Sequence, residues 1–251
     1  MKHSQCSMVV SLLAITLLAI LACPGIHEAG AQSIAELTAA AKKGGPEAAF
    51  KLAAAYEKQY DFENAIKWYK TAARGNYAPA QLALGFCYAN GQGVKEDWKE
   101  AASWYRKAAD QGLVEAQFRL AVCYERGLGV PKNSNDALTW YEKAANNGLV
   151  DAQFAAGELH YANKNYAAAF NWYLKAANRG LPDAQHRVAI AFLIGQGAAR
   201  DLVEGGKWLV LASMGGREDP AKLHEKLSTI YRLTPEQIAE SIKRAKEFKP
   251  Q

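Results

Sequence analysis

The sequence lacks the residue patterns that usually mark a catalytic or metal centre. None of its five histidines lies in an H-E-x-x-H pattern or beside a pair of cysteines. A G-x-S-x-G nucleophile motif and a G-x-x-x-x-G-K-[ST] phosphate loop are also missing. Its carboxylates are spread along the chain as helix caps and surface charges, so no catalytic pair stands out. We therefore expect no enzyme activity, no cofactor and no bound metal.

Long runs of like charge are missing too. The net charge of +5 is scattered, so we expect no nucleic-acid partner. Runs of β-branched residues are scarce while alanine is abundant, which favours helices.

The N-terminus lacks an apolar run long enough to cross a bilayer comfortably. The stretch from Met8 to Ala22 has only 15 residues, and Lys2 precedes it. An Ala29-Gly30-Ala31 site follows, so residues 1–31 have the form of a secretory signal peptide. We expect cleavage after Ala31 and an exported mature chain, periplasmic or secreted, without a transmembrane segment. An alternative is a lipoprotein anchored through Cys23, because Ile20-Leu21-Ala22-Cys23 resembles a lipobox.

What the sequence does contain is a repeat. The pair Ala-Gln recurs at Ala80, Ala116, Ala152 and Ala184, with steps of 36, 36 and 32 residues, and Ala48 lies 32 residues before the first. Trp-Tyr pairs begin at Trp68, Trp104, Trp140 and Trp172 in the same register, and Trp208-Leu209 closes the series. Self-similarity at this period predicts a solenoid of stacked helical pairs, because no single unit can bury its own apolar face.

Each unit reads as a helix A and a helix B. The expected N-caps of the B helices are short polar residues at the same place in every unit: Asp61, Asp97, Asn133, Asn165 and Asp201. Glu100 and Glu204 lie where a capping-box partner would. Glycines at 112, 148, 180 and 216 are placed to end the B helices in a left-handed conformation. Units 1 and 4 lack the G-x-G-V segment of the others, which predicts tighter turns between their two helices.

The expected fold is all-α, a right-handed α/α solenoid of about five helical-pair repeats with N- and C-terminal capping helices. We divide the chain into a signal peptide (1–31), an N-terminal capping helix (32–47), the solenoid (48–219) and C-terminal capping helices (220–251). The solenoid units start near 48, 80, 116, 152 and 184. In the last segment Thr234, Pro235 and Gln237 form a helix-start signal.

The repeat pattern A-x-x-x-L-G-x-x-Y-x-x-G-x-G-V-x-x-D-x-x-x-A-x-x-W-Y-x-K-A-A-x-x-G resembles the Sel-1-like repeat family, a branch of the tetratricopeptide-type solenoids. Residues 80–117 match it almost throughout, and the other units match with gaps. The resemblance implies a non-catalytic adaptor or scaffold that holds a protein partner, here an envelope or signalling partner of a bacterium. The alternative is cell-wall glycan binding or a peptidoglycan-associated factor, and a wall-active enzyme is the least favoured.

The resemblance also implies that helix A lines the concave side. At about 100° per residue, the third, sixth and tenth residues after the first Ala of each helix A point away from the core. The candidate partner-binding residues on this face, chosen as exposed aromatic, apolar and charged groups, are Phe86, Asn90, Arg119, Val122, Arg126, Glu158, Arg187 and Ile190. The second residues (Phe50, Leu82, Phe118, Phe154) are expected to pack on the preceding helix B.

Cys87 and Cys123 lie one repeat apart on the core side of helix A. Equivalent helices of stacked units should lie about 8–10 Å apart, beyond the reach of a disulfide of about 7 Å between Cα atoms. We expect two buried free thiols, with a disulfide formed on export as the alternative.

Overall fold

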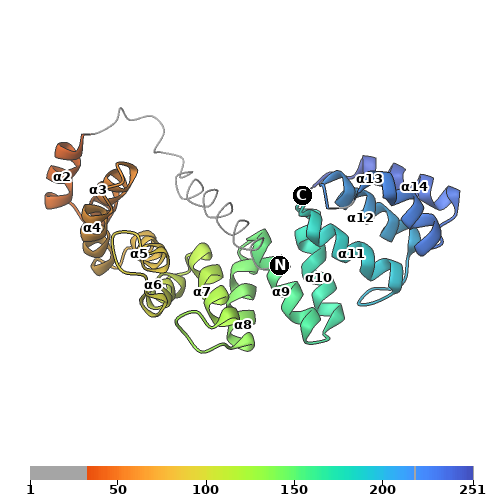
Figure 1. Cartoon of the computed structure of the whole chain (residues 1–251), viewed down its shortest axis with the longest axis horizontal. Coiled ribbons are helices and arrows are strands. Elements are labelled where there is room, and N and C mark those ends of the chain that lie inside the picture. The colour runs from red at the N-terminus through yellow and green to blue at the C-terminus, as the bar shows by residue number, and fades with distance from the viewer. Residues whose placement is uncertain (1–32, 218, 251) are drawn as a thin grey trace.

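The computed structural model describes residues 33–217 and 219–250 as an arch of packed α-helices, with no strand in these ranges (Figure 1). The predicted signal peptide and Cys23 lie outside the described residues. The five helical pairs are α3 (Pro46–Lys58) with α4 (Phe62–Arg74), α5 (Ala78–Asn90) with α6 (Trp98–Asp110), α7 (Val114–Arg126) with α8 (Ser134–Asn146), α9 (Val150–Ala162) with α10 (Tyr166–Asn178), and α11 (Pro182–Ile194) with α12 (Leu202–Met214). This confirms the all-α solenoid of five pairs.

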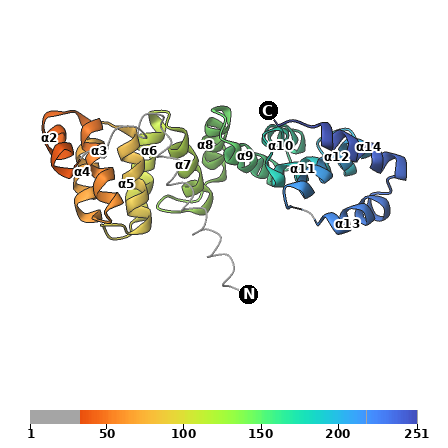
Figure 2. The ribbon, with the colours of Figure 1, turned by 90° about the horizontal axis from the view of Figure 1, so that it is seen from above.

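Single helices close the two ends of the stack. At the N-terminal end α2 (Ile34–Lys43) packs on α3 without a partner of its own. At the other end α14 (Pro235–Glu247) packs on α12, after the short helix α13 (Pro220–Glu225) and one π-helical turn, η1 (Lys226–Ile230). The two ends lie far apart in Figure 1, and the view from above shows that the helix pairs change orientation along the chain, so the stack twists (Figure 2).

Small residues of helix A let the bulky residues of helix B into the core. Ala80 and Leu84 on one face of α5 are fully buried, as the helical period predicts. A Cβ atom on Gly85 would overlap the ring of Tyr105 in α6, and one on Gly157 would overlap Tyr173 in α10. These glycines therefore provide the space for the tyrosines of units 2 and 4, and alanine takes the same position in units 1 and 3 (Ala53, Ala121).

The glutamine of each Ala-Gln pair joins one unit to the next. Its buried side-chain amide donates to the last turn of the preceding helix B: Gln81 to the Ala73 carbonyl (3.4 Å), Gln117 to Ala109 (3.4 Å), Gln153 to Ala145 (3.2 Å) and Gln185 to Ala177 (3.4 Å). The last carbonyls of a helix lack the regular helical donor. These four accept from the backbone N–H groups of Asn76, Gly112, Gly148 and Gly180, and the glutamine amide adds a second donor to each. The Ala-Gln motif is thus a cap for the C-terminus of helix B.

All five predicted residues are the N-caps of the B helices, and four of the five make the predicted side-chain hydrogen bond. Asp97 accepts from the N–H groups of both Lys99 and Glu100. Asp61, Asn133 and Asp201 make equivalent bonds, whereas Asn165 caps α10 without a side-chain bond. The predicted capping boxes of Glu100 and Glu204 do not form, and Glu204 instead binds Lys207 at 2.6 Å. Thr234 and Gln237 do form the predicted box.

The connection between helices A and B has two lengths, as predicted. In units 2, 3 and 5 seven residues separate the helices, and in units 1 and 4 only three do. The longer connections lie against the preceding unit: a Cβ atom on Gly93, Gly129 or Gly197 would overlap the carbonyl at the start of the previous helix B. That helix starts with an aromatic residue (Phe62, Trp98, Tyr166) under each such loop. The helix B that precedes unit 4, α8, starts with Ser134 instead, and the turn of unit 4 is short.

None of the helices within the described ranges is both long and apolar enough to span a membrane.

Candidate functional site

The helix-A face is the surface formed by the third, sixth and tenth residues after the first Ala of helices α3, α5, α7, α9 and α11. In the first half of the arch α5 and α7 lie toward its inner side, and α6 and α8 toward its outer side (Figure 1). The tenth residues form an exposed edge in all five units: Lys58, Asn90, Arg126, Ala162 and Ile194. The third and sixth residues are mostly half-buried, because they contact the neighbouring unit.

Phe86 is not an exposed anchor, contrary to the sequence-based expectation. Its side chain is 6% exposed and its ring meets that of Tyr105 edge-on, with centroids 5.6 Å apart. The guanidinium of Arg119 lies over the same ring at 5.0 Å, and its Nε donates to Glu115 at 2.7 Å. Arg119 therefore covers an apolar residue of the preceding unit and has its charge paired.

Glu158 and Arg187 make the equivalent contact between units 4 and 5. Arg187 Nη2 donates to Glu158 Oε2 at 2.7 Å, and Tyr173 Oη donates to Oε1 of the same carboxylate at 2.6 Å. Both charged side chains remain more than one third exposed. The structure thus brings these two predicted residues together into one polar cluster on the face.

The remaining candidates differ in accessibility. Asn90 is exposed and its amide donates to the Phe86 carbonyl at 3.0 Å. Val122 and Ile190 are half-buried. Arg126 is exposed, and its side chain makes no hydrogen bond or ion pair with residues 33–217 or 219–250. It is the candidate most available to a partner.

The phenylalanines at the second position contact the tyrosine of the following helix B, a contact that the sequence did not predict. Ring centroids are 5.6 Å apart for Phe50 and Tyr69, 5.4 Å for Phe118 and Tyr141, and 5.7 Å for Phe154 and Tyr173. In unit 2, where this position is Leu82, Phe86 one turn later takes the same place. The tyrosine of helix B therefore always meets one phenylalanine of its own unit in units 1 to 4.

Sequence reasoning missed an aromatic depression beside Arg187, which we call the tyrosine notch. It is a small cavity of about 30 Å³ whose walls include Tyr161, Tyr166, Arg187, Ile190 and Gln196. The rings of Tyr161 and Tyr166 meet edge-on at 5.2 Å, and Tyr161 is 40% exposed. Arg187 lies over the Tyr161 ring at 5.5 Å, and Tyr161 Oη donates to Gln196 at 3.3 Å. The sequence signal that could have revealed this notch is Tyr161, which stands next to the three-residue turn of unit 4.

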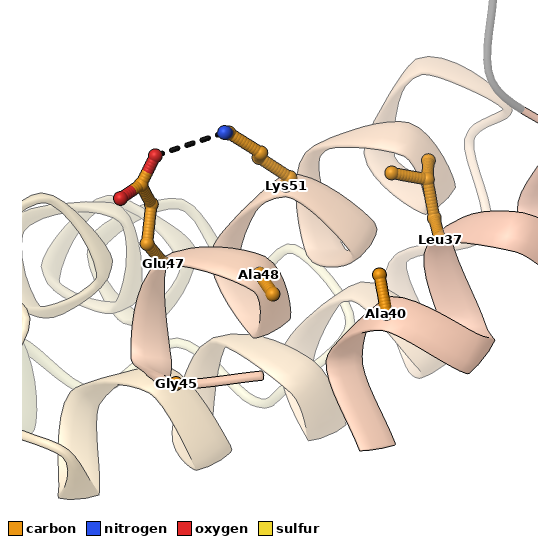
Figure 3. Close-up of a pocket in the computed structure, with 6 residues that line it drawn as sticks. All are labelled: Leu37, Ala40, Gly45, Glu47, Ala48 and Lys51. Carbon is orange, nitrogen blue, oxygen red and sulfur yellow. Dashed lines mark ion pairs between the residues drawn. The ribbon is translucent and has the colours of Figure 1, made fainter. Parts of the chain in front are cut away.

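A second cavity, of about 350 Å³, lies between α2 and α3 (Figure 3). Leu37, Ala40, Ala48 and the ion pair of Lys51 with Glu47 line it. This pair is exposed and joins two neighbouring turns of one helix, so no polar groups from different elements converge there. The cavity offers an apolar recess without an arrangement suited to chemistry.

A row of lysine–tryptophan contacts, also missed, runs along the B helices. The ammonium groups of Lys107, Lys143 and Lys175 lie over the indole rings of Trp104, Trp140 and Trp172 at 3.7, 3.8 and 3.9 Å. Each lysine follows its tryptophan by three residues, which places both on one side of the helix. These contacts cover the indole rings that pack between units.

The two cysteines are free and buried, as predicted. Burial raises the pKa of the Cys87 thiol to about 12 and that of Cys123 to about 11. Both thiols are therefore protonated at neutral pH.

His160 occupies in unit 4 the position that Tyr88 and Tyr124 occupy in units 2 and 3. Its Nε2 atom lies 2.9 Å from a carboxylate oxygen of Glu142. In the ranges described, no three His, Cys, Asp or Glu side chains are grouped as metal ligands.

Comparisons with known proteins agree with the helical pairs. The family model of the Sel1 repeat matches residues 46–77, 78–113, 114–149, 150–181 and 182–216. A Sel1 repeat protein from Oxalobacter formigenes has a similar solved structure, with a TM-score of 0.66 and 27% identity over 81% of this chain and 88% of that one. YrrB, described as a TPR protein with an unusual peptide-binding site, has a TM-score of 0.53 and 18% identity over 77% of this chain and 99% of that one. A comparison with curated proteins found no match.

Proposed function

Because this chain belongs to the Sel1 repeat family, we propose that it is a non-catalytic adaptor that holds a protein partner on its helix-A face outside the cytoplasm. Repeats of this fold generally mediate contacts between proteins, and Sel1 repeat proteins are generally scaffolds without catalytic activity. The finer proposal is a bacterial periplasmic adaptor for an envelope or signalling protein.

The observation that carries the proposal is the composition of the helix-A face. Its side chains change from unit to unit, whereas the core residues repeat. Arginine and tyrosine, the residue types enriched at energetically important contacts, lie together at Arg187 and Tyr161. Arg126 on the exposed edge has its donors available for a partner. A surface of this kind fits a protein ligand better than a reaction.

The proposed location rests on the N-terminal sequence. A charged start, an apolar stretch and an Ala-Gly-Ala site favour export with cleavage after Ala31. Expression of the full chain in a bacterium, followed by intact-mass measurement of the fractionated protein, tests it. A mature chain starting at Gln32 in the periplasmic fraction would support export, an acylated Cys23 would replace it with a lipoprotein, and an uncleaved cytoplasmic chain would contradict both.

Affinity capture tests the adaptor proposal. The chain from Gln32 to Gln251 would be used as bait in native envelope extract, and bound proteins would be identified by mass spectrometry. The Arg126→Glu variant should lose the partner at least tenfold, because the substitution reverses an unpaired charge on the face. Arg179→Glu is the matched control, since Arg179 is an exposed arginine at the end of α10, a B helix. Capture that Arg126→Glu leaves unchanged would contradict the assignment of this face.

A further inference from the structure

We infer that the tyrosine notch and the basic edge around it bind an acidic linear segment of the partner, with one large apolar side chain of that segment anchored against Tyr161 and Ile190. This inference rests on the proposed function, because it states the chemistry of the protein partner. It is carried by three observations on the described residues: a small notch between units 4 and 5, an exposed apolar side chain in its wall, and unpaired cations beside it.

The tyrosine notch lies between units 4 and 5, beside the short turn of unit 4. Its walls come from the end of α9 (Tyr161), the start of α10 (Tyr166), the middle of α11 (Arg187, Ile190) and the connection after α11 (Gln196). Only three residues join α9 to α10, and the rings of Tyr161 and Tyr166 at the two ends of this turn meet at 5.2 Å. The exposed part of Tyr161 makes the notch accessible from solvent.

Accessible apolar side chains lie in the wall of the notch and next to it. Tyr161 is 40% exposed and Ile194, one turn after Ile190, is 55% exposed. Tyr161 and Ile194 are two of the most exposed large apolar side chains of the solenoid units, and Gln196 links their two units through the bond from Tyr161. The cavity of about 30 Å³ has room for the tip of one side chain and not for a cofactor.

The charge beside the notch selects the partner. Residues 158–166 and 187–201 carry three basic and two acidic side chains, and Arg126 lies at the exposed edge position of the neighbouring unit 3. Both carboxylates already accept hydrogen bonds: Glu158 from Tyr173 and Arg187, and Asp201 from the Glu204 N–H at 2.9 Å. Arg200 donates to the Leu193 carbonyl at 3.2 Å, whereas the side chains of Arg126 and Lys164 make no hydrogen bond or ion pair within the part of the chain that the structure describes.

Unpaired cations around an apolar anchor site attract acidic segments and repel basic ones. Arg187, although bound to Glu158 through one nitrogen, is 39% exposed and retains further N–H donors for a carboxylate. The occupant is therefore a segment with acidic residues next to one leucine-sized or aromatic side chain.

A peptide selection tests this. A random linear peptide library displayed on phage would be selected on the chain from Gln32 to Gln251, and the affinity of the enriched peptides would be measured by fluorescence anisotropy. We expect enrichment of Asp and Glu beside a large apolar residue, and an affinity that falls with added salt. Replacing the acidic residues of an enriched peptide with Asn and Gln should weaken binding at least tenfold.

Variants locate the bound peptide. Tyr161→Ala and Lys164→Glu should each weaken binding about tenfold or more. Their matched controls are Tyr60→Ala and Arg179→Glu, because Tyr60 is the 82%-exposed tyrosine in the short turn of unit 1 and Arg179 is an exposed arginine of a B helix. Lys164 is exposed in a turn, so Lys164→Glu keeps the test valid even if Tyr161→Ala disturbs folding.

Three results would overturn the inference: no enriched peptide, enriched peptides without acidic residues, or binding that Lys164→Glu leaves unchanged. None of these affects the adaptor proposal itself, which depends on capture of a partner protein and its loss in the Arg126→Glu variant. The two ideas can therefore fail separately.

Discussion

At the scale of single residues, the same position in different units serves different purposes. The sixth residue after the first Ala of helix A is buried at Phe86, half-buried at Val122 and part of an ion pair at Glu158. The exposure of this sixth residue depends on the third residue after the first Ala in the next unit. Arg119 covers Phe86, and Arg187 pairs with Glu158. Binding residues are therefore those whose neighbour in the next unit leaves them uncovered.

The buried thiols give a prediction at this scale. Cys87 and Cys123 should not react with Ellman's reagent at pH 8 in the native chain from Gln32 to Gln251, because burial keeps both protonated and out of reach. Both should react at once in denaturant. Because this chain lacks the other two cysteines, Cys6 and Cys23, the absorbance reports these two alone. Rapid native labelling would show that helices α5 and α7 open readily.

The same thiols make stability depend on pH in the alkaline range. The ordinary thiol pKa is 9.0, and that of folded Cys123 is raised to about 11. The unfolded chain therefore loses its thiol proton first, so the contribution to stability is complete below about pH 9 and is lost as pH rises toward 11. Urea unfolding followed by circular dichroism at pH 7, 9 and 10.5 should show this decline, and Cys123→Ala should reduce it.

At the scale of elements, the repeated helix starts and ends follow from local chemistry. Each B helix starts after a short polar residue and is followed by a glycine with positive φ at 112, 148, 180 and 216. In the first unit Asn76 takes the glycine's place with φ 59°. Asparagine tolerates this conformation better than most residues. Asn165 alone among the five caps makes no side-chain bond, although its backbone angles (φ −84°, ψ 64°) are close to those of Asp61 (φ −84°, ψ 69°), which does make one.

Asp97→Ala should lower the free energy of unfolding by about 1 kcal/mol, because two N–H groups at the start of α6 lose their acceptor. Asn165→Ala is the matched control and should change stability by less than about 0.5 kcal/mol, because its side chain makes no capping bond. Urea denaturation of the three proteins measures both. Equal losses would mean that the position itself, and not the hydrogen bond, determines the effect.

At the scale of the whole molecule, the units are coupled by backbone contact as well as by side chains. The loops of units 2, 3 and 5 lie on the start of the preceding helix B, and the Ala-Gln amides bind its end. Helices α4, α6 and α10 are therefore held at both ends by the following unit, whereas the start of α8 has no such loop over it and α12 has no following unit.

Gly129→Ala should destabilise the chain by about 1–3 kcal/mol more than Gly112→Ala. Both glycines have positive φ, 70° and 86°, so both substitutions carry a left-handed penalty of about 1–2 kcal/mol. Only at Gly129 would the new methyl group also overlap the carbonyl of Trp98, whereas nothing lies within 4 Å at Gly112. The comparison of their unfolding free energies isolates the contact between units. Equal losses would show that the loop can move away without cost.

The repeat, the all-α solenoid, the positions of the helix starts and ends, and the two turn lengths could be predicted from the residues alone. These follow from spacing within one helix or one turn, where a few neighbouring residues carry the whole signal. Which parts of the helix-A face are available could not be predicted, because it depends on contacts between units. Arg119 covers Phe86, Arg187 reaches Glu158 29 residues away, and Tyr161 meets Gln196 35 residues away. Such contacts depend on how far and at what angle each unit is displaced from the last, which is a property of the packed stack and not of any one repeat.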